Sequence, residues 1–368
     1  MLKLKRNWIL VLLPISFIIL MIVKRFPAVA EYVFARGIYK LVGTIIAFFT
    51  NWLPFSLAEI GIILIPFLVL AILIIFIKKI ISSKGRRKLI LIKGVINTAC
   101  LGTLIFFFLT VMCLVNIHRF SFASVRGLEV KQSGVLELYD MTLDLAQKTN
   151  DAKEHVSTDD LGAMVSELSF KEIAKEAARA FETLSQTYPT LGAIKGTAKP
   201  IFFSRAMSYT GIIGVYVPFT MESNVDTDIS DYSIPETMCH ELAHLQGYMK
   251  EDEANYIGYL ACMHSDNNEF KYSGYMMALV TSMNALYDSD PDLYVEVYEK
   301  LSDKVKADFK ANREYWKEIE ETELGQKVEQ AADSFNDSYL KFSGQEEGIK
   351  TYGLVVDLLL AEYRKGAQ

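Results

Sequence analysis

Long apolar runs separated by short polar segments fill the first third of the chain. Each of three runs approaches the roughly 20 residues that a helix needs to cross a bilayer. These runs are residues 8–23, 57–77 and 95–117. The pattern predicts a membrane region at residues 1–118 with three transmembrane helices.

Residues 31–54 also carry apolar side chains at helical spacing, but Arg36 and Lys40 interrupt them. This segment is predicted to be an interfacial or re-entrant helix. If it crossed the membrane instead, everything after it would lie on the opposite side.

The first run has an alternative interpretation. Ala28, Val29 and Ala30 resemble a signal-peptide cleavage site, although Lys24 and Arg25 interrupt the approach to it. Cleavage there would remove one span and leave the rest of the chain on the same side.

Residues 119–368 change to the pattern of a water-facing domain. Helical periodicity covers Val135–Lys148, and Ser169 with Glu172 has the spacing of a capping box that begins another helix. Ser273, Asp290 and Thr322 are candidate starts of later helices.

Residues 199–225 differ from their surroundings because β-branched and aromatic side chains alternate there with glycines. They predict a hairpin or a small sheet. The expected fold is therefore mainly α with a small β-hairpin or sheet.

Charge separates the two parts of the chain. Residues 1–118 hold 14 Lys or Arg and two acids, a net charge of +12, whereas residues 119–368 hold 24 basic and 42 acidic residues, a net charge of −18. An acidic domain argues against nucleic acid as a partner. The basic clusters flanking the apolar runs predict a multi-pass cell-membrane protein with a cytoplasmic N-terminus and an extracytoplasmic C-terminal domain.

The four cysteines do not have the spacing of a structural zinc site. Cys100 and Cys113 fall in the third apolar run, where packing explains them. Cys239 and Cys262 are interpreted as small buried residues, with a disulfide between them as the alternative.

The chain carries the pentapeptide His240-Glu241-Leu242-Ala243-His244. Residues four apart share one face of a helix, so both imidazoles can bind one ion while Glu241 reaches a water on it. Ser233, Pro235 and Glu236 predict the start of this helix shortly before the motif.

A third ligand is available on the next segment. Gly247 predicts the end of the first helix, and an acidic stretch beginning at Glu251 opens a second one. Catalytic zinc takes three protein ligands and keeps one position for water, so a carboxylate from this second helix would complete the set.

The stretch CHELAHLQGYMKEDEAN resembles the gluzincin metallopeptidases. In that family a glutamate on the helix after HExxH is the third ligand, and an Asp or Asn four residues later supports a ligand histidine. The resemblance implies that Glu251 is the ligand and Asn255 its supporting residue. Glu253 is the alternative ligand.

The chain also resembles a bacterial membrane protein family catalogued only as a domain of unknown function. This resemblance rests on the apolar N-terminal runs, the segment at residues 202–211 and the stretch CHELAHLQGYMKEDEAN. This resemblance implies a gluzincin-like zincin domain in the bacterial envelope. It implies no substrate.

The expected function is a membrane-anchored zinc-dependent peptidase that acts on polypeptides near the membrane. Glu241 is the expected general base, and Tyr352 is a candidate stabiliser of the oxyanion. The strands at 199–225 could pair with an extended substrate, or simply support the HExxH helix. The alternatives are a non-catalytic zinc- or peptide-binding receptor and an envelope assembly factor.

Overall fold

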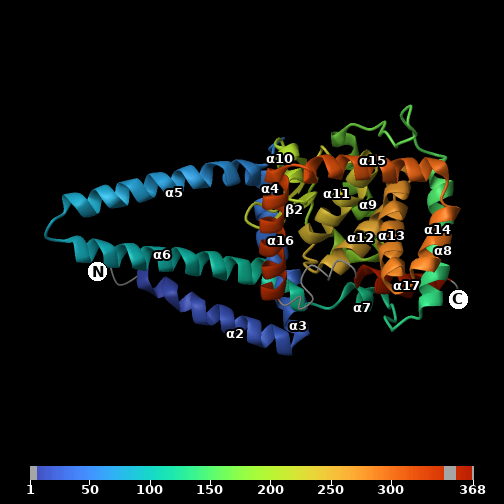
Figure 1. Cartoon of the computed structure of the whole chain (residues 1–368). Coiled ribbons are helices and arrows are strands. Elements are labelled where there is room, and N and C mark those ends of the chain that lie inside the picture. The colour runs from blue at the N-terminus through green and yellow to red at the C-terminus, as the bar shows by residue number, and fades with distance from the viewer. Residues whose placement is uncertain (1–5, 344–353, 367–368) are drawn as a thin grey trace.

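Long helices project from one side of a helical body in the computed structural model, which describes residues 6–343 and 354–366 (Figure 1). The projecting helices are α2 (Leu12–Arg25), α5 (Leu57–Ser82) and α6 (Arg87–Leu109). The shorter elements that join them to each other and to the body are η1 (Arg6–Val11), α3 (Pro27–Val29), η2 (Ala30–Tyr39), α4 (Lys40–Thr50), η3 (Thr110–Leu114) and η4 (Asn116–His118).

Within the described residues, four helical stretches are long and apolar enough to cross a membrane, namely Asn7–Arg25, Pro27–Thr50, Leu57–Ser82 and Arg87–His118. Each of the three predicted runs lies inside one of them, which confirms the apolar N-terminal helices. The remaining stretch, residues 27–50, also has the length to span. The orientation of the chain in a membrane stays a prediction.

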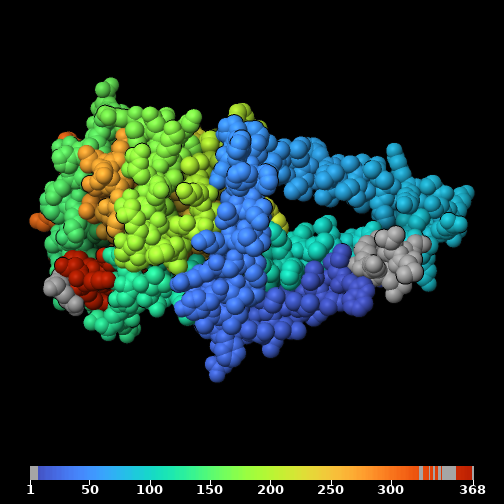
Figure 2. All heavy atoms as spheres, turned by 180° about the vertical axis from the view of Figure 1, so that it is seen from behind, coloured from blue at the N-terminus to red at the C-terminus, as the bar shows by residue number. Residues whose placement is uncertain are grey.

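α4 runs in a different direction from the projecting helices. It lies crosswise to α5 and α6, at the boundary between them and the body (Figure 1). Seen from behind, the atoms of this segment form a blue column along that boundary (Figure 2). This arrangement agrees with the predicted interfacial helix better than with a fourth parallel span.

The body is built from helices packed around α11, α12 and α13. Its helices are α7 (Phe122–Arg126), α8 (Val135–Lys153), α9 (Phe170–Thr187), η5 (Pro189–Gly192), α10 (Ser204–Ser208), η6 (Asp231–Ser233), α11 (Ile234–Leu245), α12 (Glu251–Met263), α13 (Asn268–Ser289), α14 (Pro291–Lys300), α15 (Asp303–Glu320), α16 (Glu323–Ser343) and α17 (Val355–Gly366). Met238, Ala243 and Ile257 of the central helices have no exposed surface.

The small sheet has three strands, β1 (Lys199–Pro200), β2 (Gly214–Val217) and β3 (Glu222–Val225), in the order β1-β3-β2. β3 pairs in parallel with β1 and antiparallel with β2. The predicted hairpin is therefore present as β2–β3. β3 is buried, and its Ser223 hydroxyl donates to the carbonyl of Glu241 at 2.8 Å, which seats the sheet on α11.

Local sequence signals give some helix starts and miss others. The capping box of Ser169 and Glu172 forms as predicted, and Asp290 caps α14. The box predicted at Ser233 and Glu236 is wrong, because Ser233 is already helical and the Glu236 amide donates to the Ser273 hydroxyl at 3.0 Å. Ser273 is accordingly inside α13 and does not begin a helix.

The membrane region and the body share a hydrophobic core to which Tyr39, Ala47, Met112 and Ile117 all belong. Division of the chain into domains at residue 118 remains a prediction. The shared core shows that the two parts pack as one unit.

A buried ion pair strengthens the same junction. The Lys199 ammonium pairs with Glu222 and donates to the carbonyl of Thr50 at the end of α4. Glu222 in turn accepts from the backbone amides of Leu57 and Ala58 at the start of α5. The sheet is thereby fixed to the end of α4 and to the first turn of α5.

Candidate metal centre

Two consecutive helices carry the predicted ligands, and glycines allow their close approach. α11 ends at Leu245, Gly247 follows with a φ of +86°, a left-handed conformation suited to glycine, and α12 begins at Glu251. A Cβ at Gly258 would lie 3.1 Å from the amide nitrogen of His240. The absence of a side chain at this position lets α12 lie directly against the HExxH turn.

His240, His244 and Glu251 each present one ligand atom, and these atoms lie within 4.8 Å of one another. The two Nε2 atoms are 3.0 Å apart, and an oxygen of Glu251 is 3.2 Å from that of His240 and 3.5 Å from that of His244. Ligands about 2.0–2.1 Å from a tetrahedral zinc ion are about 3.3 Å from one another. The three separations fit such an ion.

The other ring nitrogens are held by acceptors. His244 Nδ1 lies 2.7 Å from the carbonyl oxygen of Tyr248, which only accepts, so this nitrogen carries a proton. His240 Nδ1 lies 2.7 Å from Oδ1 of Asn255. In the neutral rings this arrangement turns both Nε2 lone pairs toward Glu251, as metal-binding histidines require.

Glu241 lies beside the three ligands, and one of its carboxylate oxygens has no hydrogen-bond partner within the described residues. This oxygen is Oε2, and the side chain is buried. Burial raises the pKa of Glu241 to about 7, although positive charge on His240 or His244 opposes the shift. A carboxylate in this state can accept a proton near neutral pH.

Gly214 of β2 is in close contact with that carboxylate. A Cβ at this position would lie 2.4 Å from Oε1 and 2.9 Å from Cγ of Glu241. Tyr216, two residues along the same strand, has its ring centre 6.3 Å from that of His244. The edge strand β2 therefore runs alongside the HExxH helix.

Of the remaining predicted site residues, Asn255 lies at the ligand cluster, Glu253 does not, and Tyr352 is outside the described residues. Glu253, the alternative ligand, accepts from the amide of Phe122 at 3.1 Å and does not join the ligand cluster. Asn255 contacts His240 as the gluzincin resemblance implies.

Tyr352 falls within residues 344–353, outside the described part of the chain. Cys239 and Cys262 are buried free thiols.

Tyr39 of the membrane region and Arg119, the first residue after it, cap α11, and the sequence does not predict them. The Tyr39 hydroxyl is 3.1 Å from the carbonyl oxygens of both His244 and Leu245. Arg119 donates to the carbonyl of Gln246 at 3.2 Å and is paired with Glu31. The only signal in the sequence is Glu31, one of two acids in residues 1–118.

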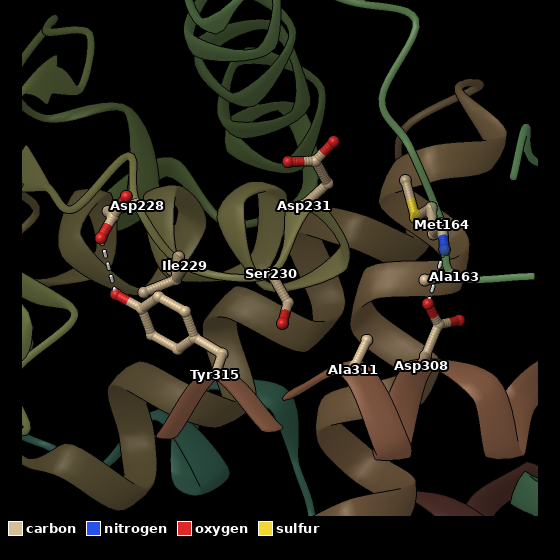
Figure 3. A pocket seen from close by; sticks show the side chains of 9 residues that line it. All are labelled: Ala163, Met164, Asp228, Ile229, Ser230, Asp231, Asp308, Ala311 and Tyr315. Atoms are coloured by element: carbon tan, nitrogen blue, oxygen red, sulfur yellow. Dashed lines mark hydrogen bonds between the residues drawn. The ribbon is translucent and has the colours of Figure 1, made fainter. Parts of the chain in front are cut away.

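An open pocket of about 260 Å³ lies apart from the ligands, between α15 and the segment before α11 (Figure 3). Its three acidic side chains already have partners. Asp228 accepts from Tyr315 and pairs with Arg205, Asp308 accepts from the amide of Met164, and Asp231 accepts from the amide of Ser166. The pocket shares no residue with the ligand cluster.

A family model matches residues 34–360, which include both ligand helices and most of the membrane region. The chain belongs to the family described as Protein of unknown function (DUF3810). No curated protein and no solved structure matches it. Membership therefore extends over nearly the whole chain but assigns no activity, which has to be inferred from the site.

Proposed function

We propose that this chain is a membrane-anchored, zinc-dependent peptidase with a gluzincin-like domain. The observation that supports the proposal most strongly is the convergence of His240, His244 and Glu251 beside Glu241, a buried carboxylate with an oxygen that no described group satisfies. A site that only held a metal would have no use for Glu241. Hydrolysis needs both the ion and the base.

The proposed chemistry divides between the ion and the chain. When bound, zinc supplies a Lewis acid that polarises the scissile carbonyl and makes water more acidic. Glu241 accepts the proton of the attacking water and passes it to the leaving amine. Asn255 and the carbonyl of Tyr248 fix the two imidazole rings. Because Gly214 has no side chain, the carboxylate of Glu241 can lie against β2.

A polypeptide is the proposed substrate because β2 is an edge strand beside the ligands. One side of β2 pairs with β3, no strand of the described residues pairs with the other side, and we propose that this side binds the backbone of an extended peptide. The basic clusters at the ends of the apolar helices favour an N-terminus in the cytoplasm and a body outside it. Substrates would then be polypeptides near the outer face of the membrane.

The experiment that tests this function uses the full-length chain in detergent micelles, since α11 is capped by Tyr39 of the membrane region and by Arg119, which is paired with Glu31 of that region. The parent, loaded with zinc, is expected to cleave members of a mixed peptide library, and a chelator is expected to abolish cleavage. Glu241→Gln keeps the zinc ligands but loses the proton acceptor. We expect it to retain zinc and to cleave about 10²–10⁴-fold more slowly.

Zinc content distinguishes the possible failures. A Glu241→Gln protein that binds zinc and cleaves as fast as the parent would remove Glu241 from the mechanism. A parent that binds zinc and peptides but cleaves none would instead favour a binding receptor. Chelator-resistant cleavage would point to a contaminating hydrolase.

A further inference from the structure

Six exposed aromatic side chains gather where the membrane region meets the body. They come from α4, from the segment between α4 and α5, and from the segment after β1. We name them the aromatic face: Phe48, Phe49, Trp52, Phe55, Phe202 and Phe203. Trp52 is 77% exposed and Phe202 is 84% exposed, fractions that are unusual for such large apolar side chains.

One side of α4 packs against the body. A Cβ at Gly43 would collide with Ile194 and Met221, and Ala47 is buried in the shared core. Its outward side carries Leu41 and Ile45, both exposed. The helix therefore packs on protein along one side and presents apolar side chains along the other.

Two basic residues lie at the start of this segment. Arg36 and Lys40 are both exposed, and Arg36 pairs with Glu31 at 2.7 Å. Exposed Lys and Arg beside an apolar stripe are characteristic of helices that lie in the plane of a membrane, where the basic groups meet anionic headgroups. The crosswise direction of α4 relative to α5 has the same implication (Figure 1).

Phe202 and Phe203 belong to the body, yet they are fixed to a membrane helix. Their backbone amides donate to the carboxylate of Glu59, in the first turn of α5, at 3.0 and 2.8 Å. The two rings contact each other edge to face with centres 5.0 Å apart. These rings are thus held at the height where the apolar stretch of α5 begins.

We propose that the aromatic face, with the outward side of α4, is seated in the headgroup and upper acyl layer of the bilayer that α5 crosses. Trp favours this depth, and Trp, Phe and Leu are typical of the buried face of helices that lie there. The body then contacts the membrane through its own residues Phe202 and Phe203, in addition to its covalent anchors. Because Tyr39 joins the same helical segment to the carbonyls of His244 and Leu245, the ligand cluster is held next to the membrane surface.

The proposal can be tested in the full-length chain by placing a fluorophore at position 202. The four native cysteines are buried, so a thiol-reactive, environment-sensitive dye will label the single exposed cysteine of Phe202→Cys. Leu161→Cys is the matched control, since Leu161 is 85% exposed and belongs to the loop between α8 and α9. This loop lies over the part of the body away from the long helices (Figure 1). Phe48→Cys supplies a second position on the aromatic face.

The labelled proteins are reconstituted into vesicles of zwitterionic and anionic phospholipids. Far-UV circular dichroism checks that each variant is folded. Quenching is measured with phospholipids that carry a spin label on the acyl chain, and separately with iodide in water. We expect the lipid-borne label to quench the dye at positions 202 and 48 several-fold more strongly than the dye at position 161. We expect iodide to quench the dye at position 161 more strongly than the dye at positions 202 and 48.

Two other outcomes would overturn the proposal. Quenching of position 202 by iodide as strongly as position 161 would show that the face is in water. Protection of position 202 from both quenchers would show that protein, such as a second copy of the chain, covers it.

Discussion

Two buried charged clusters in the body differ in how their polar atoms are used. In the first, Asp308 pairs with Lys153 and accepts hydrogen bonds from the Tyr272 hydroxyl and the Met164 amide. In the second, His240, His244 and Glu251 converge with their ligand atoms on one another. The first cluster joins helices that are distant in the sequence, and the second joins two helices separated by a turn. Both clusters are nearly excluded from solvent.

We infer from this difference that the first cluster serves the fold and that the second serves the proposed chemistry. Around Asp308, positive and donor groups match the oxygens, so the set is complete without any further ligand. In the second cluster two imidazole lone pairs and a carboxylate oxygen point to one place, an arrangement that a cation stabilises. Glu241 beside it keeps an unsatisfied oxygen.

The largest effect on stability is expected at Asp308. Asp308→Ala leaves the Lys153 ammonium buried without its partner and should lower the free energy of unfolding by about 3–5 kcal/mol. The measurement is denaturant unfolding of the full chain in micelles. Glu154→Ala is the control, because its ion pair with Lys304 is half exposed and should contribute less than about 1 kcal/mol. Equal effects of the two substitutions would remove the structural role of Asp308.

An intermediate effect is expected from substitution of Asn255, which should change zinc affinity and leave the stability of the fold nearly unchanged. Asn255→Ala removes the acceptor that orients His240, so zinc affinity should fall about 10–100-fold while unfolding changes little. Competition with a fluorescent zinc chelator measures the affinity. Asn255→Asp keeps an acceptor oxygen and should bind zinc nearly as well as the parent. If Asn255→Ala binds zinc like the parent, the second cluster is not organised as proposed.

The smallest effect is expected at Glu362, a carboxylate that is partnered like Asp308. Burial alone would raise its pKa, but hydrogen bonds from Arg126 and Tyr256 hold the pKa below the usual value of 4.5. The charged form is then favoured in the folded state, so Glu362 contributes stability above pH 4.5 and loses it as the pH falls through the lowered pKa.

Thermal unfolding of the parent and of Glu362→Gln between pH 6 and pH 3 checks this sign. The parent should be the more stable protein at pH 6, and the gap should narrow with acidification. A gap that widens toward pH 3 would contradict the shift.

The ligand cluster could be anticipated from sequence because its members are close along the chain. His240 and His244 are one helical turn apart, their helix ends at Leu245 shortly before Gly247, and Glu251 begins the next helix. The apolar helices and the β2–β3 hairpin were also predictable, since each has its own local period. The capping box of Ser169 and Glu172 depends only on residues of one turn, and it forms.

Features that depend on tertiary contacts were not predictable. Ser233 fails as a cap because Ser273, 40 residues later, supplies the acceptor for the Glu236 amide. Tyr39 reaches the carbonyl of His244 across 205 positions. No periodicity or spacing reports such contacts, so the attachment of the HExxH helix to the membrane region became visible only in the structure.

Zinc content of the purified full-length protein tests the central claim most directly. We predict one ion per chain by inductively coupled plasma mass spectrometry in the parent and in Glu253→Gln. We predict none in His240→Ala and a large loss in Glu251→Gln, which differs from Glu253→Gln by two positions on the same helix. A parent without zinc, or Glu251→Gln with as much zinc as Glu253→Gln, would contradict a metal centre built from His240, His244 and Glu251.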